Sequence, residues 1–271
     1  MEPQSLEAGA PAPLRRLTSS TRERVMAGLL ADSAAERRGA FVEAIARGWL
    51  DRGPRTVVTA VLLGPSSSTA SRVAFGQHVA AGVPARATFL REEDGIAYLI
   101  TRGLPVSGPE EWIAREAQRL GVPVLGIGTA PLDASASDLG DAAEQSRTAA
   151  ELSAALPEFD GAAASTALGG WALVHSVALG PQRLADISPA AAELRRGDRI
   201  QRETIEVYLD EGGQVRAACS RLHIHRTTLY YRLENMPEAV RAALDDGWQR
   251  STLHLALKLL RLWESTGVID A

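Results

Sequence analysis

The chain has 271 residues, 45% of them hydrophobic, with 29 lysine and arginine residues against 33 aspartate and glutamate residues and a formal net charge of −4. This length predicts two domains, and the apolar content argues against a disordered chain. Lys258 is the only lysine and Cys219 the only cysteine. Mechanisms that need another lysine, such as a P-loop, are therefore excluded, as are an internal disulfide and a paired-cysteine metal or redox site.

The N-terminal part predicts a tail followed by helix. Residues 1–18 hold three prolines without a periodic pattern, which is typical of a flexible tail. They contain no apolar signal-peptide core, and no run in the chain reaches the roughly 18 apolar residues of a membrane span. We therefore expect a soluble, cytoplasmic protein. Residues 19–52 repeat apolar side chains at helical spacing and predict a helical segment of one or two helices.

Residues 53–157 alternate between strand and helix patterns. Strands are predicted at 56–63, 85–90, 96–101 and 122–128, and helices at 69–81, 109–120 and 135–156. An acidic turn at 91–95 joins the second and third strands and predicts a hairpin. The order βαββαβ is typical of an α+β, ferredoxin-like domain. A doubly wound parallel sheet fits less well, because a hairpin makes two neighbouring strands antiparallel.

In the remaining chain, a segment broken by glycine and proline gives way to a continuous helical pattern at about residue 199. Residues 158–198 are divided into short pieces by glycine and proline, and we expect a partly packed linker with short helices there. Residues 199–271 have a helical pattern throughout and predict a separate all-α domain.

Two short helices around a turn are predicted within residues 214–233. The apolar residues of both helices fall on one side of each, where they can form a narrow core: Val215, Ala218, Leu222, Ile224, Leu229 and Leu233. Ala218 is small at the position where the two helices should cross closely, which is what a helix-turn-helix requires.

Basic residues dominate the outer side of this pattern. Between Gln214 and Tyr231 the charged residues are all arginine, a local run that suits binding to phosphate. Near the start of the second helix, Arg226 and Thr227 can reach base edges, while the other residues suit phosphate contacts. The residues expected to bind double-stranded DNA are Arg216, His225, Arg226, Thr227, Thr228, Tyr230, Tyr231 and Arg232. The alternative is a pair of structural helices with a solvated arginine face.

The run His225-Arg226-Thr227-Thr228-Leu229-Tyr230-Tyr231-Arg232-Leu233 resembles the recognition helix of the PucR/CdaR family of bacterial transcriptional regulators. The leucine pattern of residues 253–259 resembles the closing pattern of the same domain, and Gln214 and Thr227 stand where the family usually has asparagine. The resemblance covers roughly residues 200–263. It implies a sequence-specific, DNA-binding regulator with a degenerate GGDEF-like middle domain. Because a single helix-turn-helix reads only a few base pairs, we expect a homodimer on paired half-sites, and a small-molecule effector is a further candidate partner. The change at Thr227 implies an altered operator preference.

The middle domain lacks the acidic residues of a working nucleotide cyclase. Residues 56–70 contain no aspartate or glutamate, although Mg²⁺ takes oxygen ligands. The acidic run 92–94 is expected to be a solvated hairpin tip, and residues 66–68 are expected to cap a helix. We expect Lys258 to extend its charge outward from an apolar helix and Cys219 to be semi-buried. No catalytic residues, cofactor or metal are expected.

Two other functions remain open at this point. The chain could be a ligand-sensing signalling protein whose helical C-terminus binds a protein partner, because the missing acidic residues do not argue against ligand binding without turnover. It could also be a purely structural dimerisation protein, although this leaves the one-sided arginine distribution unexplained.

Overall fold

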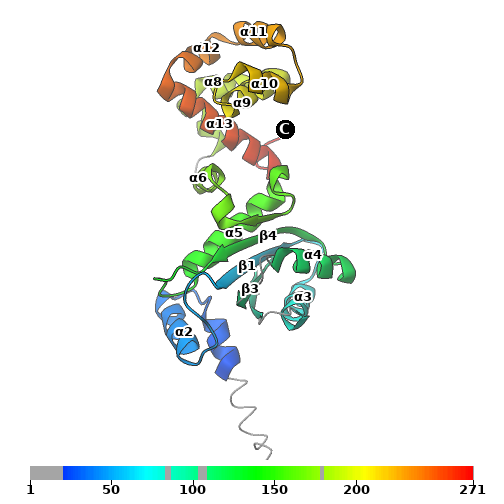
Figure 1. The fold of residues 1–271 in the computed structure, drawn as a ribbon, viewed down its shortest axis with the longest axis vertical. Helices are drawn as coiled ribbons and strands as arrows, with labels where there is room; N and C mark the ends of the chain where they lie inside the picture. The colour runs from blue at the N-terminus through cyan, green and yellow to red at the C-terminus, as the bar shows by residue number, and fades with distance from the viewer. Residues whose placement is uncertain (1–20, 83–86, 103–108, 178–179, 271) are drawn as a thin grey trace, which may run out of the picture. The chain divides into compact units, whose positions relative to one another are not determined.

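The computed structural model describes residues 21–82, 87–102, 109–177 and 180–270 (Figure 1). The chain divides into two compact units, Met1–Leu168 and Gly169–Ala271. The tail predicted at 1–18 lies outside the described residues. Within the described ranges, no helix combines the length and the apolar composition that a membrane span requires.

The first unit is a mixed α+β unit built on a five-stranded sheet with the order β2-β3-β1-β4-β5. Its strands are β1 (Thr56–Leu63), β2 (Thr88–Glu93), β3 (Ile96–Arg102), β4 (Val124–Pro131) and β5 (Ala162–Ala164). The central strand β1 runs antiparallel to both β3 and β4, β2 runs antiparallel to β3, and β5 runs parallel to β4.

Successive residues of a strand point to opposite faces of the sheet, and here the residues on both faces are apolar. Helices therefore cover both faces. On one face, Val58 and Tyr98 pack in one cluster with Phe41 of α2 (Ala34–Ala46) and with residues of the helix at 21–28 and of α5 (Gly140–Ala155). On the other, Val61 packs with residues of α3 (Thr69–Gly82) and α4 (Pro109–Leu120).

Helix α5 lies against β4 with almost no space between the two backbones. A Cβ atom added at Gly126 would overlap the carbonyl oxygen of Ala150, and one added at Gly128 would overlap the carbonyl oxygen of Ser146. The two glycines are two residues apart in a strand and therefore point to the same face. This close approach is the reason that both positions are glycine.

The expected hairpin turn is too long, and the expectation of a solvated acidic tip fails at Glu92 but holds for Asp94, which is exposed. Strands β2 and β3 extend to Glu93 and Ile96, so the turn is only Asp94-Gly95, with φ values of 51° and 85°, as in a two-residue hairpin loop. Glu92 is not solvated: its side chain is 5% exposed and accepts hydrogen bonds from Arg72 Nε at 2.6 Å and from the Gly95 N–H at 3.0 Å. The charge of Arg72 on α3 offsets the desolvation of this carboxylate.

The expected linker at 158–198 is divided between the two units. Strand β5 and the residues up to Leu168 belong to the first unit, whereas α6 (Gly170–Ser176), α7 (Leu184–Ile187) and α8 (Pro189–Arg196) belong to the second. Short helices were expected here, but a fifth strand was not. β5 consists of three alanines, a segment too short and too weak in β-propensity to give a strand pattern.

The second unit contains only helices among its described residues. Its C-terminal part consists of α9 (Arg199–Asp210), α10 (Val215–Leu222), α11 (Arg226–Glu234), α12 (Glu238–Asp245) and α13 (Gly247–Ser265). Side-chain acceptors of Asp198, His225 and Asp246 cap α9, α11 and α13, satisfying backbone N–H groups that have no partner within a helix. Gly212 and Gly213 both have positive φ in the turn between α9 and α10, a conformation that favours glycine.

Candidate nucleic-acid interface

The helix-turn-helix predicted from the sequence is formed by α10 and α11, and α9 completes its core. Ala218, Leu229 and Val207 are its buried residues. The partly buried residues packed against them are Tyr208, Val215, Cys219, Leu222, Ile224 and Leu233. The six predicted core residues are therefore together, and Cys219 is semi-buried as expected. The sequence pattern missed Val207 and Tyr208, whose helix α9 precedes the motif.

The turn between α10 and α11 is held by local hydrogen bonds. His223 adopts a left-handed conformation with φ of 54°, and the N–H of Ile224 donates to the carbonyl of Cys219 at 3.1 Å, which closes the end of α10. His225 then begins α11: its Nδ1 accepts from the Thr227 N–H at 3.4 Å and lies 2.9 Å from the Thr227 hydroxyl. Two expected DNA-binding residues thus fix the start of the recognition helix.

Most of the expected DNA-binding residues are exposed. On α10 and α11 and at the His225 cap these exposed residues are Arg216, His225, Arg226, Thr227, Thr228, Tyr230 and Tyr231. Tyr230 and Tyr231 are 50% and 66% exposed, which is high for large aromatic side chains. Within the described part of the chain, no hydrogen bond or ion pair engages the guanidinium of Arg216 or of Arg226. Both cations are therefore available to an anionic partner.

Arg232 is held differently from the other seven. It is half-buried, and its guanidinium donates to the hydroxyl of Thr204 on α9 at 3.0 Å. Because this bond ties α11 to α9, the side chain supports the position of the recognition helix. Whether Arg232 also contacts phosphate stays a prediction.

Arg221 shows why a run of basic residues in sequence overstates the local charge. Its guanidinium forms ion pairs with Asp210 Oδ2 at 3.3 Å and with Glu211 Oε1 at 3.1 Å, both from the end of α9. No acid intervenes between Gln214 and Tyr231 along the chain, but α9 brings two beside Arg221. The exposed positive charge of the motif comes from Arg216 and Arg226.

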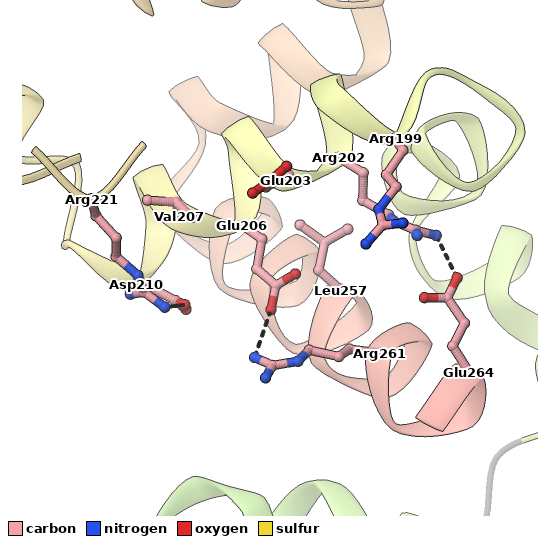
Figure 2. Close-up of a pocket in the computed structure, with 10 residues that line it drawn as sticks. All are labelled: Arg199, Arg202, Glu203, Glu206, Val207, Asp210, Arg221, Leu257, Arg261 and Glu264. Carbon is pink, nitrogen blue, oxygen red and sulfur yellow. Dashed lines mark hydrogen bonds and ion pairs between the residues drawn. The ribbon is translucent and has the colours of Figure 1, made fainter. Parts of the chain in front are cut away.

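Behind the helix-turn-helix, charged side chains join α9 to α13 around a pocket of about 340 Å³ (Figure 2). Lys258 Nζ lies 2.7 Å from Glu206 Oε1 and 2.8 Å from Asp210 Oδ1, and His254 Nε2 lies 2.7 Å from Asp210 Oδ1. The expectation that Lys258 extends outward is wrong, since its side chain is only 16% exposed. Glu206 and Asp210 are four residues apart, so both face α13, where Lys258 is four residues from His254.

The carboxyl group of Asp210 has an altered pKa. Burial raises its pKa, but the hydrogen bonds and charges of His254 and Lys258 lower it by more in total, and the result is a pKa of about 2. Asp210 is therefore ionised at neutral pH and links three helices through His254, Lys258 and Arg221. This cluster fixes α9, which carries part of the helix-turn-helix core.

Other candidate sites have structural explanations. Ser68 Oγ accepts from the Ser71 N–H at 3.1 Å and so caps α3 as expected. His78 lies on the surface between Glu116 and Arg119. In the ranges that the structure describes, no group of three or more histidine, cysteine, aspartate or glutamate side chains could hold a metal ion.

Two known proteins are similar to parts of this chain. The purine catabolism regulatory protein of Bacillus subtilis (strain 168) is 37% identical over 71 residues, which are 26% of this chain and 13% of that protein. The crystal structure of a regulator of polyketide synthase expression from Bifidobacterium adolescentis has a TM-score of 0.35 at 14% identity, covering 90% of this chain and 94% of that one. A TM-score this low supports no conclusion about the fold.

A segment that includes the helix-turn-helix matches a known protein family. The matched segment begins in α9, includes the whole of α10, α11 and α12, and ends in α13. These elements supply the core, the exposed recognition helix and the charged cluster behind it. Residues 201–259 match the family described as the PucR C-terminal helix-turn-helix domain.

Proposed function

We propose that this chain is a sequence-specific, DNA-binding transcriptional regulator of the PucR type that acts as a homodimer in the cytoplasm and responds to a small-molecule effector. The observation that carries the proposal is the exposed face of α11, where the Arg226 guanidinium has no partner in the described chain, on a core that matches a PucR helix-turn-helix domain. The DNA-binding residues are the eight predicted from the sequence. The alternative of a helical protein-partner module is not favoured by this match.

The chemistry of the exposed side chains supports two kinds of contact with DNA, one to the bases and one to the phosphate backbone. Arg226 and Thr227 lie in the first turn of α11, the part of a recognition helix that contacts base edges. Arginine can bind guanine through two hydrogen bonds, and the threonine methyl can contact thymine. Arg216, in the first turn of α10, suits a phosphate on the flanking backbone.

The first unit serves as a regulatory domain in this proposal, with a degenerate GGDEF-like, ferredoxin-like fold over residues 53–157. The support is the order and antiparallel pairing of β1 to β4 and the lack of acidic residues at 56–70. The Arg72–Glu92 ion pair joins α3 to the hairpin, at the place where a working cyclase would need room for phosphate and metal. The unit is therefore proposed to act without turnover.

The test is selection of bound sequences from a random double-stranded DNA library by the full chain, followed by affinity measurements over a range of salt concentrations. Arg226→Ala should lower affinity for the selected duplex by about 5- to 150-fold, since a bidentate base contact contributes about 1–3 kcal/mol. Arg216→Ala should weaken all duplexes alike and reduce the salt dependence by about one phosphate contact.

Arg250→Ala is the matched control, because Arg250 is an exposed arginine that belongs to α13 and not to α10 or α11. It should leave affinity and melting temperature unchanged. Arg232→Ala should weaken binding and also lower the melting temperature, because it loses the bond to Thr204. The proposal is refuted if no sequence is enriched, or if the Arg226 and Arg250 variants bind DNA equally.

A further inference from the structure

Helix α13 carries an apolar stripe that the rest of its unit does not cover. Trp248 is 82% exposed and Leu255 is 47% exposed. They are seven residues apart, or two turns, and so lie on the same side of the helix. We call Trp248, Ser251, Thr252 and Leu255 the α13 stripe.

The middle of the α13 stripe is small, and its polar groups are already satisfied. The Ser251 hydroxyl donates to the carbonyl of Gly247 at 2.9 Å, and the Thr252 hydroxyl donates to the carbonyl of Trp248 at 3.0 Å. An apolar surface can therefore cover these residues without leaving a hydroxyl group unpaired. The two large side chains stand at the ends, with a shallow region between them.

The charges beside Trp248 argue against DNA as the partner of the stripe. Asp245 and Asp246 immediately precede α13 and are exposed. Two carboxylates next to the tryptophan repel a phosphate backbone, in contrast to the exposed arginines of α10 and α11. A protein surface is the partner that fits an exposed tryptophan and leucine.

A second copy of the same stripe is complementary to it. When two α13 helices cross antiparallel with the two-fold axis between Ser251 and Thr252, Trp248 of each copy lies opposite Leu255 of the other. The small residues Ser251 and Thr252 at the centre allow the two helices to approach closely. At each end of the contact, Trp248 of one copy then packs against Leu255 of the other. This is the self-complementary pattern of an isologous contact.

We propose that the α13 stripe is the contact between two copies of this chain bound to neighbouring half-sites, an inference that rests on the proposed action as a DNA-bound dimer. Two Trp248 side chains supply about 400 Å² of buried surface, whereas stable interfaces bury about 1,200 Å² or more. The contact is therefore weak in free solution. On DNA it is strengthened, because two chains on one duplex have a high effective concentration.

Cysteine cross-linking of the full chain tests the geometry. In a Cys219→Ala background, Ser251→Cys places the only thiol close to the proposed two-fold axis. Arg250→Cys, the control, places it two residues after Trp248 and so on the far side of the helix. With a short bismaleimide, Ser251→Cys should form covalent dimers at least tenfold faster than Arg250→Cys. Equal rates would overturn the proposal.

Trp248→Glu tests the energetics. It should lower the self-association constant, measured by sedimentation velocity, at least tenfold, and abolish cooperative binding to a duplex with two copies of the selected site. Affinity for a single site and the melting temperature should not change, because the side chain is exposed. A loss of single-site affinity would assign Trp248 to DNA and overturn the proposal. Failure of DNA binding itself is a separate result, since Arg226→Ala should leave the rate of Ser251→Cys cross-linking measured without DNA unchanged.

Discussion

The contacts of α5 with β4 and of α9 with α13 are opposite ways to hold a helix in place. The first is made at Gly126 and Gly128, where the helix backbone meets the strand directly. The second is made by long charged side chains from both helices, including Asp210 and Lys258. Backbone packing depends on volume and hardly on solution conditions. Ion pairs tolerate changes of volume better but depend on pH and salt. Each contact should therefore fail under a treatment that spares the other.

The largest effect is expected at Gly128. Gly128→Ala should destabilise the first unit by more than about 3 kcal/mol, because the added methyl group overlaps the backbone of α5 at Ser146 and neither backbone can move easily. The measurement is hydrogen exchange of β4 and α5 peptides in the full chain, compared with peptides from α9 to α13. The second unit should keep its protection.

Gly39→Ala is the control for this substitution. Gly39 lies inside α2, has no atom within 4 Å of the added Cβ, and does not have a positive φ. Alanine is a better helix former than glycine, so this variant should gain about 0.5–1 kcal/mol. If both variants were equally stable, the packing of α5 on β4 would not be as close as described.

The first unit also shows what can be predicted from local sequence. The strand at Thr56–Leu63 is found at the predicted residues, because a β-branched apolar run between turn residues has few other solutions. The close fit of Gly128 to α5 gives no such signal, since Ser146 is 18 residues away and glycine has many uses. The Arg72–Glu92 pair was missed for the same reason.

The second contact should break with acid. Asp210 has its pKa lowered to about 2, so its stabilisation is fully present above its ordinary pKa of about 3.9 and is lost as the pH falls through about 2. Asp210→Asn should cost about 1–2 kcal/mol at pH 7, after allowing for solvent screening. The difference in the free energy of unfolding between the native chain and the variant should disappear as the pH falls from 4 to 2.

Hydrogen exchange of α9 and α13 peptides measures this gap. Asp186→Asn is the control, because Asp186 pairs with Arg183 on the surface, where its side chain is 64% exposed. That variant should not differ from the native chain at any pH. A gap for Asp210→Asn that persisted at pH 2 would mean that the carboxylate charge does not hold α9 to α13. Gly128→Ala, by contrast, should show no such pH dependence.

The two regions also differ in how far the functional site was predictable. The helix-turn-helix core follows a short local pattern, so its six predicted residues were found together. The charged cluster behind it joins residues about 50 positions apart, such as Glu206 and Lys258. Spacing within α9 or within α13 places each pair on one face, but only the packed fold brings the faces together. The hydrogen bond between Arg232 and Thr204 of α9 was missed likewise, because the two residues are 28 positions apart.

The smallest expected effect concerns backbone conformation alone. His223 is exposed and has φ of 54° at the end of α10, where glycine carries no steric penalty. His223→Gly should therefore stabilise the second unit by about 0.5 kcal/mol, although glycine gains entropy in the unfolded chain. Gly213→Ala, at φ of 79° in the preceding turn, should destabilise it by about 1 kcal/mol. Urea unfolding should give opposite signs for the two variants. Neither change should depend on pH between 4 and 2, because neither touches the Asp210 cluster or the volume of a packed core. Equal signs would show that side-chain contacts, rather than φ, decide stability at this turn.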